Sequence, residues 1–241
     1  MKKSVTLNSP EFETVKEIVV KGVQKGGDKK QYVFLDQHTK EECERSFNQT
    51  WDEIRAIGTF FFKKGLNGKK KIAIIGDNCF EWMIVYYATL VGGNITVPMD
   101  CKLSADDLAD QLIRCDCDAL VYTKRFTGMV EDFQNDPSLP EMLYFDISKD
   151  YKEFIKEGNA VLATGDNSFE NAEVKPEDLA CIAYTSGTTA KSKGVMLTHK
   201  NIASNCSSAC RAHTGRHAIG FLPLNHTYAW VSALFSSYIL S

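Results

Sequence analysis

Residues 69–97 read KKKIAIIGDNCFEWMIVYYATLVGGNITV and predict a strand, a helix and a second strand in this order. Residues 72–75 are apolar at every position, which is typical of a strand covered on both faces. The turn at residues 76–78 leads into a helical segment through Trp82 and Leu90, and two glycines then end it. The unit therefore predicts neighbouring parallel strands joined by a helix.

The same alternation of strands and helices extends from this unit toward both ends of the chain. We expect helices over residues 11–24, 47–64 and 126–133, and strands over residues 32–35, 119–122 and 142–145. Another helix is expected after Ser104, a good N-cap residue that is followed by two aspartates in the first turn. The pattern predicts an α/β fold in three layers, with a mostly parallel sheet flanked by helices on both faces.

The domain organisation is inferred from a change in composition. Residues 159–175 are rich in Gly, Asn, Asp and Glu and resemble a linker. We therefore expect an N-terminal α/β subdomain over residues 1–158, a linker-like stretch over 159–175 and a further segment over 176–241. Within this last segment we expect strands at 180–184, 195–197 and 218–222, a helix at 200–212 and an apolar helix at 228–240.

Composition excludes several classes of protein. The chain has 241 residues, of which 44% are hydrophobic, and its net charge is −3, so no basic field indicates binding to nucleic acid. The N-terminus lacks the apolar segment of a secretory signal, and we expect a cytoplasmic protein. The uncharged stretch 217–241 is interrupted by Pro223 and is shorter than a membrane-spanning helix requires. No transmembrane segment is expected, although peripheral contact with a membrane stays open.

The eight cysteines do not form a disulfide framework of the kind that small secreted domains use. Cys115 and Cys117 form a C-x-C pair, and no second pair stands at the spacing of a zinc finger. A metal site formed by Cys206, Cys210 and His213 stays a possible interpretation, but the length of the chain and the absence of a secretory signal favour reduced thiols without a shared function. We therefore assign no metal-ligating residues.

Residues 184–194, YTSGTTAKSKG, follow an apolar strand and combine hydroxyl groups, glycines and lysines. The hydroxyl residues are Thr185, Ser186, Thr188, Thr189 and Ser192, the glycines Gly187 and Gly194, and the lysines Lys191 and Lys193. Glycine allows the backbone to approach a ligand closely, hydroxyl and N–H groups donate to phosphate oxygens, and lysine neutralises their charge. Composition alone leaves two interpretations open: a polyphosphate-binding loop or a flexible surface loop.

Two known nucleotide-binding motifs are excluded at this loop. A Walker P-loop requires two glycines that precede its lysine at fixed positions, and Thr185 and Ala190 stand at these positions. No G-x-G-x-x-G sequence follows a strand, so a dinucleotide-binding fold has no support.

The order of the residues is more specific than their composition. Residues 184–199, YTSGTTAKSKGVMLTH, closely resemble the signature of the adenylate-forming (AMP-binding) family, which includes acyl-CoA synthetases, luciferases and the adenylation domains of peptide synthetases. Two further stretches resemble motifs of that family in the same order: VPMD at 97–100 and FLPLNH at 221–226. The latter has the form typical of long- and medium-chain acyl-CoA synthetases, and the resemblance covers the chain from about residue 12 onward.

The resemblance implies an α/β fold and a reaction in two steps. A carboxylic acid, expected to be a fatty acid, attacks the α-phosphate of Mg-ATP and gives an acyl-adenylate and pyrophosphate, and a thiol, usually coenzyme A, then takes the acyl group. ATP, Mg²⁺ and coenzyme A would therefore enter as substrates.

The same resemblance assigns roles to individual residues. The phosphate-binding residues it implies are Thr185, Ser186, Gly187, Thr188, Thr189, Lys191 and Lys193, and Lys193 matches the lysine of the motif, with a catalytic role. His226 matches a position that lines the acyl pocket, and its other interpretation is a core histidine at a helix start.

Two residues of the loop depart from the signature. Ala190 stands where the family usually has glycine, and Ser192 where it usually has proline. Alanine at a positive φ angle costs about 1 kcal/mol, and loss of proline loosens the loop. Neither change removes a phosphate ligand.

Members of this family continue beyond the motifs found here. They have segments that bind adenine, magnesium and ribose, and a C-terminal domain with a further lysine. We therefore expect the chain to be the N-terminal part of an acyl-CoA synthetase that resembles long-chain-fatty-acid–CoA ligases, and to make no acyl-CoA alone. The alternatives are a non-catalytic nucleotide-binding or interaction module and an adenylation domain with another thiol acceptor. The sequence indicates neither the acyl chain length nor the oligomeric state.

Overall fold

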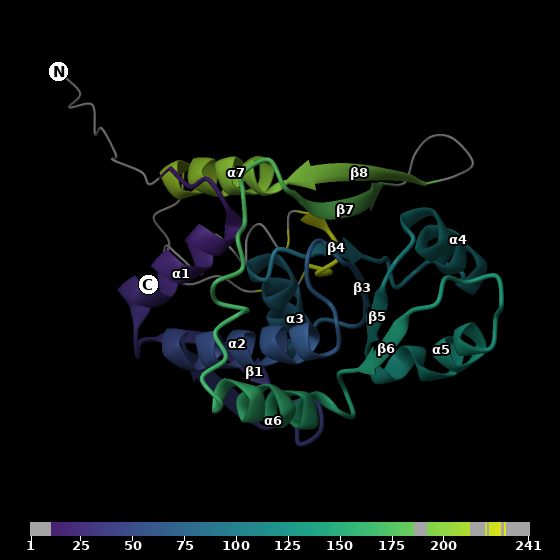
Figure 1. Ribbon diagram of the computed structural model, residues 1–241, viewed down its shortest axis with the longest axis horizontal. Coiled ribbons are helices and arrows are strands. Elements are labelled where there is room, and N and C mark those ends of the chain that lie inside the picture. Colours follow the sequence, from purple (N-terminus) through teal and green to yellow (C-terminus); the bar gives the residue numbers. More distant parts are fainter. Residues whose placement is uncertain (1–10, 186–191, 213–219, 221, 228, 230–241) are drawn as a thin grey trace.

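The computed structural model describes residues 11–185, 192–212, 220, 222–227 and 229, and within them six strands form the main sheet. The strands are β3 (Lys71–Ile75), β4 (Ile95–Pro98), β5 (Ala119–Tyr122), β6 (Leu143–Asp146), β7 (Leu179–Thr185) and β8 (Lys193–Thr198). Their order is β6-β5-β3-β4-β7-β8 (Figure 1). Only β8 is antiparallel to its neighbour, so the predicted mostly parallel sheet is confirmed.

Helices cover both faces of this sheet. They are α1 (Val15–Gly26), α2 (Phe47–Lys63), α3 (Phe80–Val91), α4 (Ala105–Cys115), α5 (Thr127–Gln134), α6 (Tyr151–Leu162) and α7 (His199–Ala212), and a short 3-10 turn (Lys124–Phe126) precedes α5. Helices α4 and α5 cover one face, and the other five helices share a core with the opposite face. The three-layer arrangement is therefore confirmed.

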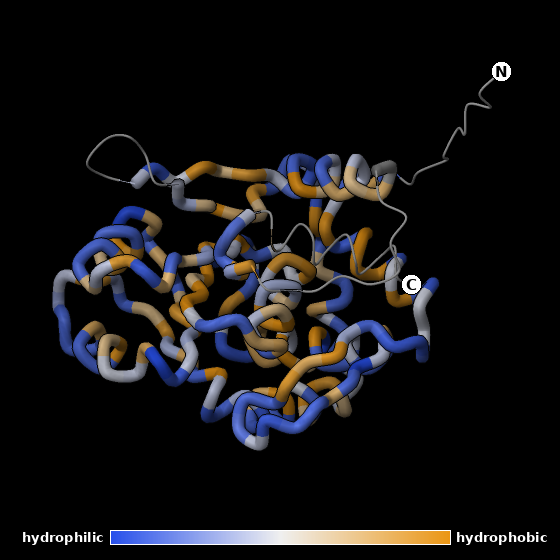
Figure 2. Tube along the Cα trace, turned by 180° about the vertical axis from the view of Figure 1, so that it is seen from behind, coloured by the Kyte–Doolittle hydropathy of each residue, from blue (hydrophilic) through white to orange (hydrophobic). Residues whose placement is uncertain are grey.

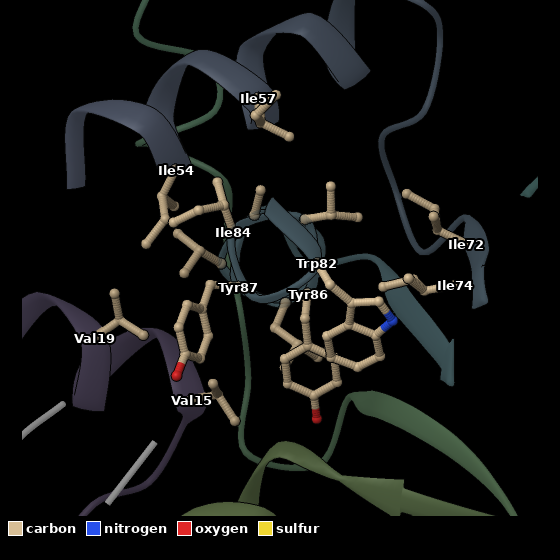
Figure 3. Packing of buried hydrophobic residues seen from close by; sticks show 14 of the residues in the cluster. Val15, Val19, Ile54, Ile57, Ile72, Ile74, Trp82, Ile84, Tyr86 and Tyr87 are labelled. Carbon is tan, nitrogen blue, oxygen red and sulfur yellow. The ribbon is translucent and has the colours of Figure 1, made fainter. Parts of the chain in front are cut away.

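Strand β3 shows how the sequence divides between the two cores. Ile72 and Ile74 belong to the core with α3, whereas Ala73 and Ile75 belong to the core with α4 and α5, because successive side chains of a strand point to opposite faces. Figure 3 shows Ile72 and Ile74 beside Trp82, with residues of α1 and α2 on the other sides of α3. Figure 2 shows apolar segments gathered inside the molecule and polar segments at its periphery.

Several helix ends follow from capping. The Ser104 side chain accepts a hydrogen bond from the backbone N–H of Asp107, which confirms the predicted start of α4. Helix α1 begins at Val15 rather than at residue 11 as predicted, because Thr14 is its N-cap and its side chain accepts from the N–H of Glu17. Helix α2 begins with a capping box between Ser46 and Gln49.

Two elements were not predicted. Strand β2 (Glu42–Ser46) pairs with β1 (Lys30–Leu35) in a separate antiparallel hairpin, and its sequence ECERS has no apolar alternation that would have indicated a strand. Helix α6 covers residues 159–162 of the linker-like stretch, and Phe169 from the same stretch is buried in the core. The division of the chain into domains stays a prediction.

Helix α6 lies very close to α2. A Cβ atom added at Gly158 would stand 1.9 Å from the backbone oxygen of Ala56, so only glycine fits at this contact. The predicted strand 218–222 and helix 228–240 lie mainly outside the described residues. Among the helices that the structure describes, none is long and apolar enough to cross a membrane.

Candidate functional site

The parallel strands β3, β4, β5 and β7 all end at the same edge of the sheet, which is their carboxyl edge. After β3 the chain turns toward α3 on one face, whereas after β4 it turns toward α4 on the other face. Adjacent strands whose connections separate in this way leave a crevice at their carboxyl ends, where α/β proteins bind ligands.

A cleft of about 540 Å³ lies at this edge. The loops that follow β3, β4 and β5 form three of its walls, and residues 222–226 form a fourth. Its lining consists of Gly76, Asp77, Asn78, Asp100, Cys101, Lys102, Arg125, Leu222, Pro223, Asn225 and His226. The cleft thus combines charged groups of both signs with an apolar contribution from Leu222 and Pro223.

Asn78 holds the segment 222–226 against the loop after β3. Its Nδ2 donates to the backbone oxygen of Leu222 at 2.7 Å, and its Oδ1 accepts from the backbone N–H of Leu224 at 2.9 Å. The N–H of His226 donates to the backbone oxygen of Pro223 at 3.0 Å, which closes a turn. These bonds place the exposed His226 on the wall of the cleft, and its assignment to an acyl pocket stays a prediction.

Contacts between the loops after β3, β4 and β5 fix the lining of the cleft. Arg125 donates to Asp77 at 2.9 Å, and the Cys101 thiol donates to the backbone oxygen of Gly76 at 3.0 Å. Burial raises the pKa of Cys101, so this thiol stays protonated and keeps its bond. A Cβ atom at Gly76 would stand 2.5 Å from the Cγ2 of Thr123, so the two loops meet without room for a larger residue.

The serine-, threonine- and lysine-containing loop connects β7 to β8, and its two ends are described. Thr185, the last residue of β7, pairs with Lys193, the first of β8, and both are exposed. Directly opposed residues of an antiparallel pair have their side chains on the same face, so the Thr185 hydroxyl and the Lys193 ammonium lie on one side of the hairpin. The residues between them, Ser186, Gly187, Thr188, Thr189, Ala190 and Lys191, lie outside the described residues.

Helix α4 contacts the base of this loop. The Tyr184 hydroxyl lies 3.2 Å from the Cys115 Sγ and donates to the backbone oxygen of Gln111 at 3.3 Å, while the Arg114 guanidinium lies 5.2 Å from the centre of the Tyr184 ring. Arg114 and Gln111 also donate to Ser192. Neither Gln111 nor Arg114 was predicted from the sequence as a site residue, although their i, i+3 spacing places them on one face of the helix.

Two thiols, Cys115 at the end of α4 and Cys117 just after it, interact with each other. A hydrogen bond from Cys117 lowers the pKa of Cys115 to about 6, with further contributions from Tyr184 and the nearby charges of Lys71 and Arg114. Burial and the same contact with Cys115 raise the pKa of Tyr184. Within the described part of the chain, no group of His, Cys, Asp and Glu side chains could hold a metal ion, and His213 lies outside that part.

The predicted site residues that the structure describes fall into two places at one edge of the sheet. His226 lines the cleft, whereas Thr185 and Lys193 lie at the base of the hairpin and are not part of its lining. Because β7 is parallel to β4, the loop leaves the sheet at the same carboxyl edge at which the cleft opens. The arrangement suits a ligand that has one anionic end and extends along this edge.

Comparison with known proteins identifies the class to which this fold and loop belong. The family model described as "AMP-binding enzyme" matches residues 20–240, and the chain is a member of that family. The predicted resemblance to adenylate-forming enzymes is therefore confirmed.

Curated relatives are acyl-activating enzymes and fatty acid ligases. The chain is 27% identical to probable acyl-activating enzyme 16, chloroplastic, from Arabidopsis thaliana, over 94% of this chain and 34% of the relative. It is 28% identical to long-chain-fatty-acid–CoA ligase 1 from Cavia porcellus, over 76% of this chain and 29% of the relative. The chain thus spans about a third of the length of these relatives.

Solved structures show the same fold. The inhibitor-bound N-terminal domain of FACL13 from Mycobacterium tuberculosis superposes with a TM-score of 0.81 at 18% identity, over 95% of this chain and 56% of that one. At this identity the likeness establishes the fold, and the chemistry has to be argued from the residues of this chain.

Proposed function

We propose that the whole protein activates a carboxylic acid, specifically a fatty acid, with Mg-ATP and transfers the acyl group to coenzyme A. The observation that carries this proposal is the position of the hydroxyl- and lysine-containing loop, at the same sheet edge as the cleft that His226 lines. Membership of the AMP-binding family and the fatty acid ligases among the relatives support it. We further propose a cytoplasmic location.

In this proposal the base of the hairpin binds the β- and γ-phosphates of ATP. The Lys193 ammonium is exposed and directly opposite the Thr185 hydroxyl, so a cation and a hydrogen-bond donor face the same ligand. When the carboxylate oxygen attacks the α-phosphorus, the bond to the bridging oxygen breaks and negative charge increases on the departing pyrophosphate. Lys193 stabilises this charge, so it acts on the transition state more than on bound ATP.

The cleft is the proposed site of the acid. Lys102 and Arg125 supply cations that attract a carboxylate, and Leu222 and Pro223 supply apolar surface for the chain attached to it. Arg125 is already paired with Asp77, which leaves Lys102 as the cation better placed to meet the substrate. In this arrangement His226 contacts the acid rather than the phosphates.

The test is acid-dependent exchange of labelled pyrophosphate into ATP. The whole gene product, supplied with fatty acids from short to long, is expected to catalyse exchange. Lys193→Ala is expected to lower the exchange rate about 10²–10³-fold, which is the typical loss when one group that stabilises transition-state charge is removed. Lys156→Ala is the matched control, because Lys156 is an exposed lysine on α6, away from the loop. Exchange by Lys193→Ala at the wild-type rate would remove the catalytic assignment.

The 241-residue chain assayed beside the whole gene product tests the expectation that it makes no acyl-CoA alone. Formation of a coenzyme A thioester by the short chain, above the level of its Lys193→Ala variant, would show that expectation to be wrong. Absence of acid-dependent exchange in every preparation would refute the proposed function itself.

A further inference from the structure

Ser192 occupies a position that connects the loop to β8, directly before Lys193. The resemblance described above places proline at this position in related signatures, and proline would restrict the backbone there by fixing its φ angle. Serine supplies no such restriction. The structure nevertheless holds Ser192 by other means.

Three hydrogen bonds from α4 end on Ser192. The Nε2 of Gln111 donates to its Oγ at 3.1 Å, and the two terminal nitrogens of Arg114 donate to its backbone oxygen at 3.0 Å and to its Oγ at 3.4 Å. Helix α4 therefore holds both the side chain and the backbone of Ser192. A fork of this kind needs the planar guanidinium, because an ammonium group cannot reach two acceptors in the same way.

Arg114 is itself held on two further sides. Its Nε bonds to the Asp110 carboxylate at 2.7 Å, one helical turn earlier, and its guanidinium lies over the ring of Tyr184. The bond to Asp110 and the contact with Tyr184 hold the guanidinium from α4 and β7, so they orient it toward Ser192.

Gln111 gives a second and independent indication. Its residue is only 1% exposed, and its Oε1 has no hydrogen-bond partner in the part of the chain that the structure describes. Burial of an amide with an unpaired oxygen is unfavourable for folding. An apolar residue would fill the same place without that penalty, so the contact of its Nε2 with Ser192 is the evident use of this side chain.

We propose that Gln111 and Arg114 are positioning residues that fix the base of the phosphate loop through Ser192, in place of the restriction that proline gives. This proposal rests on the proposed function, since it assumes that Lys193 meets the phosphates of ATP. Because Lys193 follows Ser192 directly, holding the Ser192 carbonyl sets the direction in which the Lys193 backbone leaves the loop. Such preorganisation favours binding by reducing the ordering that the ligand must impose.

The test combines Arg114→Ala with Ser192→Pro in the whole gene product. Arg114→Ala is expected to raise the KM for ATP about tenfold, which corresponds to ~1.4 kcal/mol, with a smaller change in kcat. Arg114→Lys should show most of the same increase in the KM for ATP, because lysine keeps the charge but not the fork. In the double variant, Ser192→Pro should return the KM to within about threefold of the wild type, because it restores backbone restriction without the helix.

Arg55→Ala is the matched control, since Arg55 pairs with Glu170 at 2.6 Å and its side chain is 32% exposed, close to the 36% of Arg114. It is expected to leave the KM for ATP unchanged. A KM that is insensitive to Arg114→Ala, or that Ser192→Pro fails to restore, would overturn the proposal.

A second readout separates this proposal from the proposed function. Amide hydrogen exchange of residues 192–194, measured without ATP, is expected to accelerate in Arg114→Ala and not in Arg55→Ala. If the wild type shows no acid-dependent pyrophosphate exchange, the proposed function fails, whereas unchanged amide exchange in Arg114→Ala shows that α4 does not fix the loop base.

Discussion

Acidification should destabilise this fold through one buried imidazole. His199, the first residue of α7, is 0% exposed, and neither of its ring nitrogens has a hydrogen-bond partner in the described part of the chain. Its pKa is lowered to about 4 by burial, which the nearby Asp178 carboxylate offsets only in part. The folded state therefore keeps this imidazole neutral at a pH where the unfolded chain already binds a proton.

The size of the effect follows from that pKa. The ordinary pKa of histidine is 6.5, and the difference from about 4 corresponds to roughly 3 kcal/mol between the two protonation states. Stability from the neutral ring is fully present above pH 6.5 and is lost as the pH falls from 6.5 toward 4, because the unfolded state binds more protons in that window. Between pH 7.5 and pH 5 the expected loss is roughly 2 kcal/mol.

Urea unfolding of the wild type and of His199→Leu at both pH values measures this term. Leucine removes the titrating group without breaking a hydrogen bond, so the variant should lose about 2 kcal/mol less than the wild type on acidification. His38→Gln is the control, because His38 is exposed, and it should behave as the wild type does. An equal loss of stability in wild type and His199→Leu would show that the buried ring does not control the acid response.

Two further substitutions test the packing and the cleft. Gly158→Ala should lower the free energy of unfolding by about 1–3 kcal/mol, because its Cβ would overlap the backbone oxygen of Ala56. Gly128→Ala is the control and should not lower it, because no atom lies within 4 Å of the new Cβ. Chemical denaturation of both variants measures the difference. Asn78→Ala should accelerate amide hydrogen exchange at Leu224 and lower the affinity for the acid, because it removes both bonds that hold residues 222–226; unchanged exchange at Leu224 would contradict this role.

The sequence was sufficient for the sheet because each central strand has a pattern with one physical meaning. Residues 72–75 are apolar throughout, and such a run between helices is a strand covered on both faces. Helix α3 has ten buried residues out of twelve, which explains why its sequence is apolar on nearly every side. Strand β2 could not be predicted because its sequence is polar. Helix α6 could not be predicted because it contains Gly158, which is unfavourable in a helix and is explained only by its close contact with Ala56.

The site was predictable in its residue types but not in its geometry. Motif order indicated Thr185, Lys193 and His226, and the structure places all three at one sheet edge, with only His226 in the lining of the cleft. The hydrogen bonds from Gln111 and Arg114 to Ser192 connect residues that are 81 and 78 positions apart in the sequence. No local pattern reveals such a contact, so the sequence predicted a looser loop at residue 192, whereas the structure shows hydrogen bonds from α4 to Ser192.

The most direct test of the central claim follows one oxygen atom. A fatty acid labelled with ¹⁸O in its carboxylate is incubated with the whole gene product, Mg-ATP and coenzyme A. The mass of the isolated AMP is then measured by mass spectrometry. Attack of the carboxylate on the α-phosphate, followed by transfer of the acyl group to the thiol, leaves one labelled oxygen on AMP. We predict that gain in the wild type and a much smaller amount of labelled AMP with Lys193→Ala; thioester formation with unlabelled AMP would contradict the account.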